Sequence, residues 1–222
     1  MATHLDLQEQ EQIDDIKAFW KQYGDLITWT LVIVLGAFAA WNGWNTWQRS
    51  QGAKAGALFD QLEQAVQAGD AERVGRAFAD LKERYPRTAY AQQGALLASK
   101  LQHEKGQADA ARATLEWAAE HAGDDAYKTA ARLRLAGLLM DAKEYDKALA
   151  QLDGPLDKSF EALVADRRGD VLMAQGKPDD ARAAYMAAWK AMHPSLDYRR
   201  VIDAKLAALG ATPEAPASGA AP

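Results

Sequence analysis

The chain has 222 residues, a formal net charge of −5 and no cysteine. Without cysteine there are no disulfides, thiolate catalysts, iron–sulfur clusters or cysteine zinc sites. An acidic chain with no run of lysine and arginine offers no electrostatic attraction to nucleic acid, so we expect no nucleic-acid partner.

Residues 1–25 form an acidic leader before the first long apolar stretch. Apolar residues in the leader recur at helical spacing with polar residues between them: Ile13, Ile16, Trp20 and Tyr23. This spacing predicts a short amphipathic helix that lies in a membrane interface. We expect a break, or a kink, at Gly24 and Asp25.

Residues 26–48 contain no charged side chain over 23 positions. A helix of that length spans roughly 35 Å, against about 30 Å for the hydrocarbon core of a bilayer. We therefore predict a transmembrane helix over 26–48, with the lipid bilayer as its surroundings. A buried core helix and a cleaved signal peptide are the alternatives. The first is rarely so long without a charge, and the second needs a short basic leader rather than this acidic one.

Aromatic residues stand near both ends of the apolar segment, as in the aromatic belts of membrane proteins: Trp20, Tyr23 and Trp29 at one end, and Trp41, Trp44 and Trp47 at the other. A stripe of small residues, Gly36, Ala40 and Gly43, would let another helix dock closely, although such residues are common in spans. Basic residues are equal in number on the two sides, Lys17 and Lys21 against Arg49 and Lys54. The charge rule for topology therefore leaves the orientation open.

Beyond Arg49 the sequence contains a repeat. Three segments align, each leading from a turn through acidic residues to an alanine: GQADAARATLEWA, KEYDKALAQLDGP and GKPDDARAAYMAA. The alanines are 37 and 33 residues apart, close to the tetratricopeptide period of about 34. A small residue precedes each alanine and a large one follows it. Each repeat of this kind consists of a first helix, helix A, and a second, helix B. We expect the small residues to let helices A and B cross closely, and the large side chain to fill the gap to the next repeat. In chain order these sets are Ser99, Ala111 and Leu115; Ala136, Ala148 and Leu152; and Gly169, Ala181 and Tyr185.

We predict an all-α fold in which a single transmembrane helix is followed, over residues 49–210, by a tetratricopeptide-like α-solenoid of about four degenerate repeats. A divergent first unit runs from about residue 53 to residue 87, and a helix over 196–209 caps the open end. Residues 211–222, rich in alanine and proline, are predicted to be a disordered tail.

No catalytic or metal-binding motif stands in the sequence, so we expect no enzyme activity, cofactor or metal. The histidines are scattered: His4, His103, His121 and His193. Carboxylate pairs such as Asp124-Asp125 and Asp179-Asp180 stand at helix starts, where negative charge suits the helix dipole. The charged segment VADRRGD, residues 164–170, is interpreted as local ion pairs on a solvated face, with partner binding as the alternative.

The order of these features resembles one known family. The resemblance covers residues 10–207 and rests on DDIKAFWKQYG from Asp14, on the span that ends in tryptophans, and on LRLAGLLMDAKEYDKALAQLD and ALVADRRGDVLMAQGKPDDARAAYMAAWK in the repeats. The chain is similar to the YfgM-type ancillary subunits of the bacterial SecYEG translocon. The resemblance implies an inner-membrane protein with a cytoplasmic N-terminus and a periplasmic repeat domain.

The resemblance also implies partners. These are the SecYEG translocon, a membrane-anchored periplasmic chaperone of the prolyl-isomerase type, and polypeptides emerging from the channel. An anchored scaffold for cell-envelope assembly or division, unrelated to secretion, is the alternative, because related repeat domains look alike. The concave face, formed by helix A positions of the middle repeats, is the expected binding surface. The sequence leaves open which residues touch a partner and what the oligomeric state is.

Overall fold

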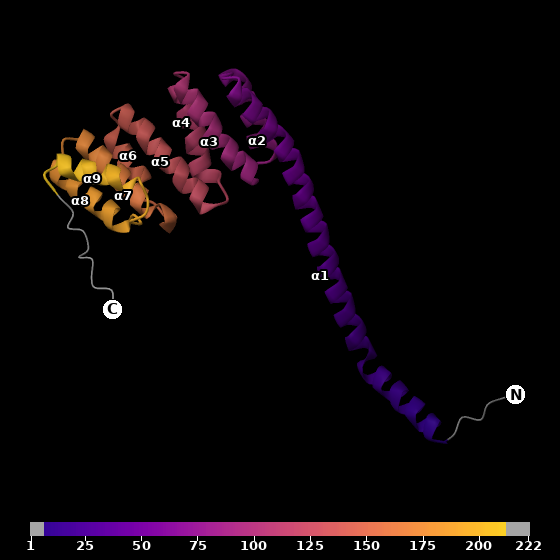
Figure 1. The fold of residues 1–222 in the computed structure, drawn as a ribbon. Coiled ribbons are helices and arrows are strands. Elements are labelled where there is room, and N and C mark those ends of the chain that lie inside the picture. Colours follow the sequence, from indigo (N-terminus) through magenta and orange to yellow (C-terminus); the bar gives the residue numbers. More distant parts are fainter. Residues whose placement is uncertain (1–6, 212–222) are drawn as a thin grey trace, which may run out of the picture. The chain divides into compact units, whose positions relative to one another are not determined.

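A computed structural model describes residues 7–211 of the chain (Figure 1). All regular structure in this part is helical: α1 (Leu7–Gln67), α2 (Ala71–Arg84), α3 (Ala89–Glu104), α4 (Ala108–His121), α5 (Asp125–Asp141), α6 (Tyr145–Gln151), the short 3₁₀ helix η1 (Lys158–Phe160), α7 (Glu161–Ala174), α8 (Pro178–Ala191) and α9 (Arg199–Ala208). The prediction of an all-α fold is confirmed. The predicted disordered tail, beyond its first residue, and the first six residues of the leader lie outside the described residues.

The chain divides into two units, Met1–Gln51 and Gly52–Pro222. Helix α1 begins in the first unit, and its last part, from Gly52 onward, belongs to the second. The predicted break at Gly24 and Asp25 is wrong, because α1 is assigned as helix without interruption through both residues. Neither residue lacks the backbone N–H that the helical ladder needs, and only proline would remove that donor. The ribbon of α1 does bend in its N-terminal part (Figure 1).

The second unit consists of four helical hairpins and one final helix. The last part of α1 pairs with α2 in the first hairpin, and α3 with α4, α5 with α6 and α7 with α8 form the next three. Consecutive helices from α2 onward pack against one another, and α9 packs against α8. The expected capping helix is therefore present as α9, although it begins at Arg199 rather than at Leu196.

Each hairpin turns in the same way. Four helices A and the last helix end in a residue with a positive φ: Gly69, Gly106, Lys143, Gly176 and Gly210. In every case the next residue donates its backbone N–H to a carbonyl five positions back, at 2.8–3.0 Å. This is the Schellman motif, which satisfies the free carbonyls at a helix end. The recurrence of one turn at one place in each unit is the clearest local sign that the units are repeats.

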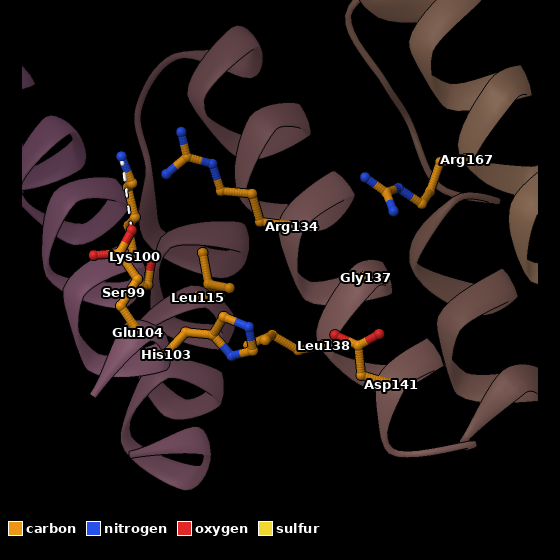
Figure 2. Close-up of a pocket in the computed structure, with 10 residues that line it drawn as sticks. All are labelled: Ser99, Lys100, His103, Glu104, Leu115, Arg134, Gly137, Leu138, Asp141 and Arg167. Carbon is orange, nitrogen blue, oxygen red and sulfur yellow. Dashed lines mark ion pairs between the residues drawn. The ribbon is translucent and has the colours of Figure 1, made fainter. Parts of the chain in front are cut away.

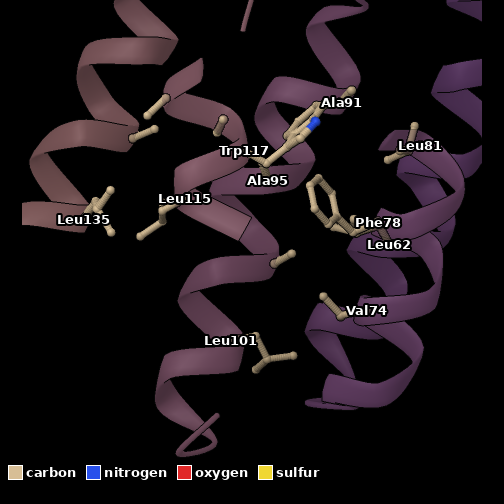
Figure 3. Packing of buried hydrophobic residues seen from close by; sticks show 14 of the residues in the cluster. Leu62, Val74, Phe78, Leu81, Ala91, Ala95, Leu101, Leu115, Trp117 and Leu135 are labelled. Carbon is tan, nitrogen blue, oxygen red and sulfur yellow. The ribbon is translucent and has the colours of Figure 1, made fainter. Parts of the chain in front are cut away.

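The core of the second unit is lined by small side chains. Half of its buried hydrophobic residues are alanines, so helix backbones approach closely. Larger residues fill the space between hairpins. Trp117 of α4 meets Phe78 of α2 edge to face, with ring centroids 5.4 Å apart (Figure 3). The first three hairpins share one cluster of buried residues with α7, and a second cluster joins α7, α8 and α9.

All nine residues expected at the helix crossings are buried: Ser99, Ala111, Leu115, Ala136, Ala148, Leu152, Gly169, Ala181 and Tyr185. The closest crossing is at Gly169, where an added Cβ would lie 2.4 Å from Cε1 of Tyr185. Tyr185 therefore packs on helix A of its own hairpin. It also faces α9, since Nζ of Lys205 lies 5.2 Å from the centre of its ring.

Candidate functional site

A groove of about 500 Å³ runs along helices A of the second, third and fourth hairpins (Figure 2). Its volume is typical of sites that hold a ligand or a few residues of a peptide. Three helices A supply its walls, because helices A lie side by side in a repeat stack, and α4 contributes Leu115. The lining residues are Ser99, Lys100, His103 and Glu104 of α3, Leu115 of α4, Arg134, Gly137, Leu138 and Asp141 of α5, and Arg167 of α7.

Small residues keep the groove open. Ser99 turns its hydroxyl back onto the carbonyl of Leu96, to which it donates at 3.1 Å. Gly137 has no side chain, and Arg167 occupies the adjacent space, with Nη1 3.6 Å from where a Cβ would stand. Larger side chains at these two positions would reach into the groove.

Two arginines lie on the groove without a close carboxylate partner. Arg134 donates from Nη1 to the carbonyl oxygen of Leu96 at 2.7 Å, and no carboxylate of residues 7–211 lies within ion-pair distance of it. Partial desolvation by neighbouring helices lowers the pKa of its guanidinium, although the residue as a whole is exposed. Arg167 is 3.9 Å from Oδ2 of Asp170, at the limit of an ion pair. In Figure 2 both guanidinium groups lie in the upper part of the groove, and Asp141 lies below them.

A second polar cluster fixes the last helix rather than lining the groove. Asp166 is only 3% exposed and accepts hydrogen bonds from Nζ of Lys205 at 2.7 and 2.9 Å and from the hydroxyl of Tyr198 at 2.8 Å. Asp170 accepts from Lys205 at 2.7 Å and from Tyr185 at 2.9 Å. These partly buried bonds tie α7 to α8 and α9, and the buried carboxylate of Asp166 is fully paired, as burial of a charge requires.

The interpretation of segment 164–170 as local ion pairs on a solvated face is therefore largely wrong. Only Arg167 and Asp170 make a pair within the segment, at 3.9 Å. Arg168 instead bonds the carbonyl of Leu152 at 2.9 Å and the carboxylate of Asp153 at 2.7 Å. The local interpretation fails because the oppositely charged partners of this helix, such as Asp153 and Lys205, come from other parts of the chain.

The structure gives the remaining polar candidates structural roles. Asp124 accepts from the backbone N–H of Ala126 at 2.8 Å and so caps α5, as its position suggested. His121 stacks on Trp117 with ring centroids 5.6 Å apart, whereas His103 lies on the groove. Within residues 7–211 no three potential metal ligands gather. His4 lies outside that range.

The first unit offers a different kind of surface. Its apolar side chains are turned outward, and one helix of the described residues, in the stretch Ile16–Gln67, is long and apolar enough to cross a membrane. The aromatic residues expected at the interfaces are all exposed, from 43% for Tyr23 to 67% for Trp29: Trp20, Tyr23, Trp29, Trp41, Trp44 and Trp47. A Cβ added at Gly36 or at Gly43 would meet no other atom within 4 Å, so that side of the helix is open.

The sequence alone did not single out Arg134 or Gly137 as groove residues, and it raised Arg167 only within segment 164–170, for which partner binding was the alternative. A signal was present: Gly137 follows the crossing residue Ala136 directly, and Arg134 stands two positions before it on the same helix A. The hydrophobic pattern says which residues are buried. It does not say which of the others face a neighbouring helix A rather than solvent.

The protein belongs to the class of tetratricopeptide-like repeat proteins, here with one long apolar helix. Its paired helices, their equivalent turns and the groove along helices A define this class. The tetratricopeptide repeat-like domain family matches residues 17–211. A protein of Neisseria gonorrhoeae is 30% identical over 94% of this chain and 100% of its own length. Proteins of Haemophilus influenzae and Escherichia coli are 28% and 27% identical, over 81% and 82% of this chain and 87% of their own lengths. All three are named ancillary SecYEG translocon subunit, and the chain belongs to this family.

Proposed function

We propose that this chain is a non-enzymatic protein-binding subunit that associates with the SecYEG translocon in the bacterial inner membrane. The observation that carries the proposal is the match, along its full length, of a relative with that name. The repeat fold supports it, because solenoids of this kind bind proteins along an open concave face. The outward-facing apolar surface of α1 supports the membrane location.

Residues 26–48 cross the bilayer in this proposal. The leader 1–25 is cytoplasmic, and the repeat domain 49–210 is periplasmic. Trp20, Tyr23 and Trp29 lie at one interface and Trp41, Trp44 and Trp47 at the other, where their amphipathic rings are favoured. The open side with Gly36, Ala40 and Gly43 docks against a helix of the translocon, because small residues permit close approach.

The repeat domain, in the finer form of the proposal, links secretory polypeptides that emerge from the channel to a membrane-anchored periplasmic chaperone. The groove of the middle hairpins is the surface for one of these partners. Its mixture of apolar and charged lining suits a peptide segment better than a small cofactor.

Site-specific photocrosslinking in cells tests the association. A photoreactive residue at Ala40 is expected to give adducts with translocon subunits, and one at Lys100 is expected to give adducts with a chaperone or an emerging chain. Phe38 is the matched control, since it lies on nearly the opposite side of the same helix. Adducts only with the chain itself or with envelope-assembly proteins would overturn the proposal in favour of an anchored scaffold.

The topology has a separate test. Because the chain has no cysteine, a single introduced cysteine is an unambiguous label. In cells with a permeabilised outer membrane, a membrane-impermeant maleimide is expected to label Ser159→Cys, which is exposed. It is expected to leave Ala18→Cys unlabelled until the inner membrane is disrupted. The reverse pattern would contradict the proposed orientation.

A further inference from the structure

The groove is lined by three basic residues, Lys100, Arg134 and Arg167, and by two acidic ones, Glu104 and Asp141. The chain as a whole is acidic, yet Arg134 has no carboxylate at ion-pair distance within residues 7–211 and Arg167 has one only at 3.9 Å. Two other arginines of the repeats are paired more closely. Arg168 lies 2.7 Å from Asp153, and Arg112 lies 2.7 Å from Glu144. The two groove arginines therefore retain the capacity to bind an anion.

Arg134 is exposed on the groove, and most of its hydrogen-bond donors have no partner within residues 7–211 of the protein. Its Nη1 donates one hydrogen bond, to the carbonyl of Leu96, whereas a guanidinium carries five donors. A carboxylate that entered the groove would accept the donors that otherwise face water. Paired N–H donors of arginine match the two oxygens of a carboxylate.

An apolar lining lies beside the two arginines. Leu138 borders the groove (Figure 2) and is partly exposed, whereas Leu115 is buried beneath it, at 2% exposed. In an extended chain consecutive side chains point to opposite sides and the rise is about 3.3 Å per residue. A bound segment with an acidic residue next to leucines would thus place both kinds of side chain within one groove of about 500 Å³.

The arginines stand within their helices rather than at the ends. Arg134 is inside α5, Asp125–Asp141, and Arg167 is inside α7, Glu161–Ala174. The lining continues from Arg134 along α5 and onto α3, whereas α7 contributes Arg167 alone. Two kinds of carboxylate fit this position, an acidic side chain within a segment and the carboxylate at a chain end, and the peptide test separates them.

We propose that the groove binds an extended segment of another polypeptide through an acidic side chain, held between Arg134 and Arg167, and through neighbouring apolar side chains placed on Leu138. The inference rests on the proposed function, because it names the kind of segment that the translocon-associated repeat domain recognises.

Fluorescence anisotropy with defined peptides tests this inference on the full chain in lipid nanodiscs. The probes are fluorescein-labelled, acetylated and amidated peptides that differ only at the centre, Leu-Asp-Leu against Leu-Asn-Leu. We expect the aspartate peptide to bind about tenfold or more tightly, as a charge-assisted hydrogen bond predicts. Arg134→Gln and Arg167→Gln are expected to remove this difference, and Arg134→Lys is expected to restore part of it.

Arg200→Gln is the matched control. Its side chain is 86% exposed on α9, outside the groove, so the aspartate preference is expected to survive. Melting curves measured by circular dichroism confirm that each variant is folded. Equal binding of the two peptides to the unaltered chain would overturn the inference. Preference for the same peptide with a free terminal carboxylate in place of the aspartate would also overturn it, in favour of chain-end recognition.

Co-purification separates this inference from the function on which it rests. The unaltered chain and Arg134→Gln are isolated in mild detergent and probed for SecYEG. If both retain the translocon but the peptides are not distinguished, the inference fails and the proposed function stands. If neither retains it, the proposed function fails, whatever the peptides show.

Discussion

Lys143 occupies a position that glycine holds in the equivalent turns of the other repeats. Its φ is 62°, in the left-handed region, where a side chain costs about 1–2 kcal/mol. Glycine removes that strain but also makes the unfolded chain more flexible, at a cost of about 0.4–1 kcal/mol. We therefore expect Lys143→Gly to raise the free energy of unfolding by about 0.5–1 kcal/mol, measured by urea denaturation. Gly176→Ala, at φ 74°, is the inverse control and should lower it.

Gly169 gives the second prediction at this scale. A methyl group there would lie 2.4 Å from a ring carbon of Tyr185, and a hydrogen bond to Asp170 holds that ring. We expect Gly169→Ala to lower the free energy of unfolding by about 1–3 kcal/mol, the usual cost of overpacking. Gly75→Ala in α2 has open space around its Cβ. It should instead stabilise by about 0.5–1 kcal/mol, because alanine is the better helix former. Equal effects of the two substitutions would contradict the close crossing.

Among the elements, α9 depends most clearly on titratable groups. Burial lowers the pKa of Lys205, but hydrogen bonds to Asp166 and Asp170 outweigh burial and raise it. Burial, followed by the hydrogen bond to Asp166, raises the pKa of Tyr198. Both groups hold their protons more tightly in the folded state than in the unfolded state. Stability is thus fully present below about pH 10 and falls as the pH rises above it.

The measurement is the melting temperature from about pH 8 to about pH 11. We expect it to fall above about pH 10, with a smaller fall in Tyr198→Phe, which lacks the phenol but keeps the ring. Tyr145→Phe is a control outside the cluster and should follow the unaltered chain. An identical pH profile in Tyr198→Phe would show that the phenol of Tyr198 makes no contribution.

The hairpins were predictable from the sequence because their signals are local. The spacing of Ala111, Ala148 and Ala181 marks every helix B after the first, and turn glycines precede two of these helices, with Lys143 in the equivalent place before the third. The partner of Asp166 was not predictable, since Lys205 stands 39 residues further along. The groove lies along helices A, where the repeat pattern placed the concave face. Its arginines were not identified, because the crossing angles of the hairpins decide which polar residues face inward.

At the scale of the whole molecule, the long first helix contributes to both units. Its last part buries Ala55, Phe59, Leu62 and Ala65 in the core of the repeats, so the transmembrane prediction and the first-repeat prediction describe one helix. We expect a chain that begins at Gly52 to be soluble without detergent and to unfold with the same urea midpoint as the full chain in detergent.

A chain that begins at Asp70 lacks those buried residues. Burial of Phe59 and of Leu62 each contributes about 1.5–3 kcal/mol, and Leu62 also packs at Gly94 of α3. The first remaining helices should therefore lose several kcal/mol of stability, seen as faster hydrogen exchange in α2 and α3. Unchanged exchange in both helices would mean that the end of α1 is dispensable for the fold.

The alanine lining of the core has a thermal consequence. The heat capacity of unfolding rises with the apolar area that water gains, by about 0.45 cal/K/mol per Å². Half of the buried hydrophobic positions carry only a methyl group, so each residue releases less apolar area than in a core of leucine and isoleucine. Calorimetry should give a heat-capacity increment below the usual value of about 12–15 cal/mol/K per residue. The stability curve of the repeats would then be broad and flat. The free energy of unfolding of the repeats would change very little as the cell cools or warms.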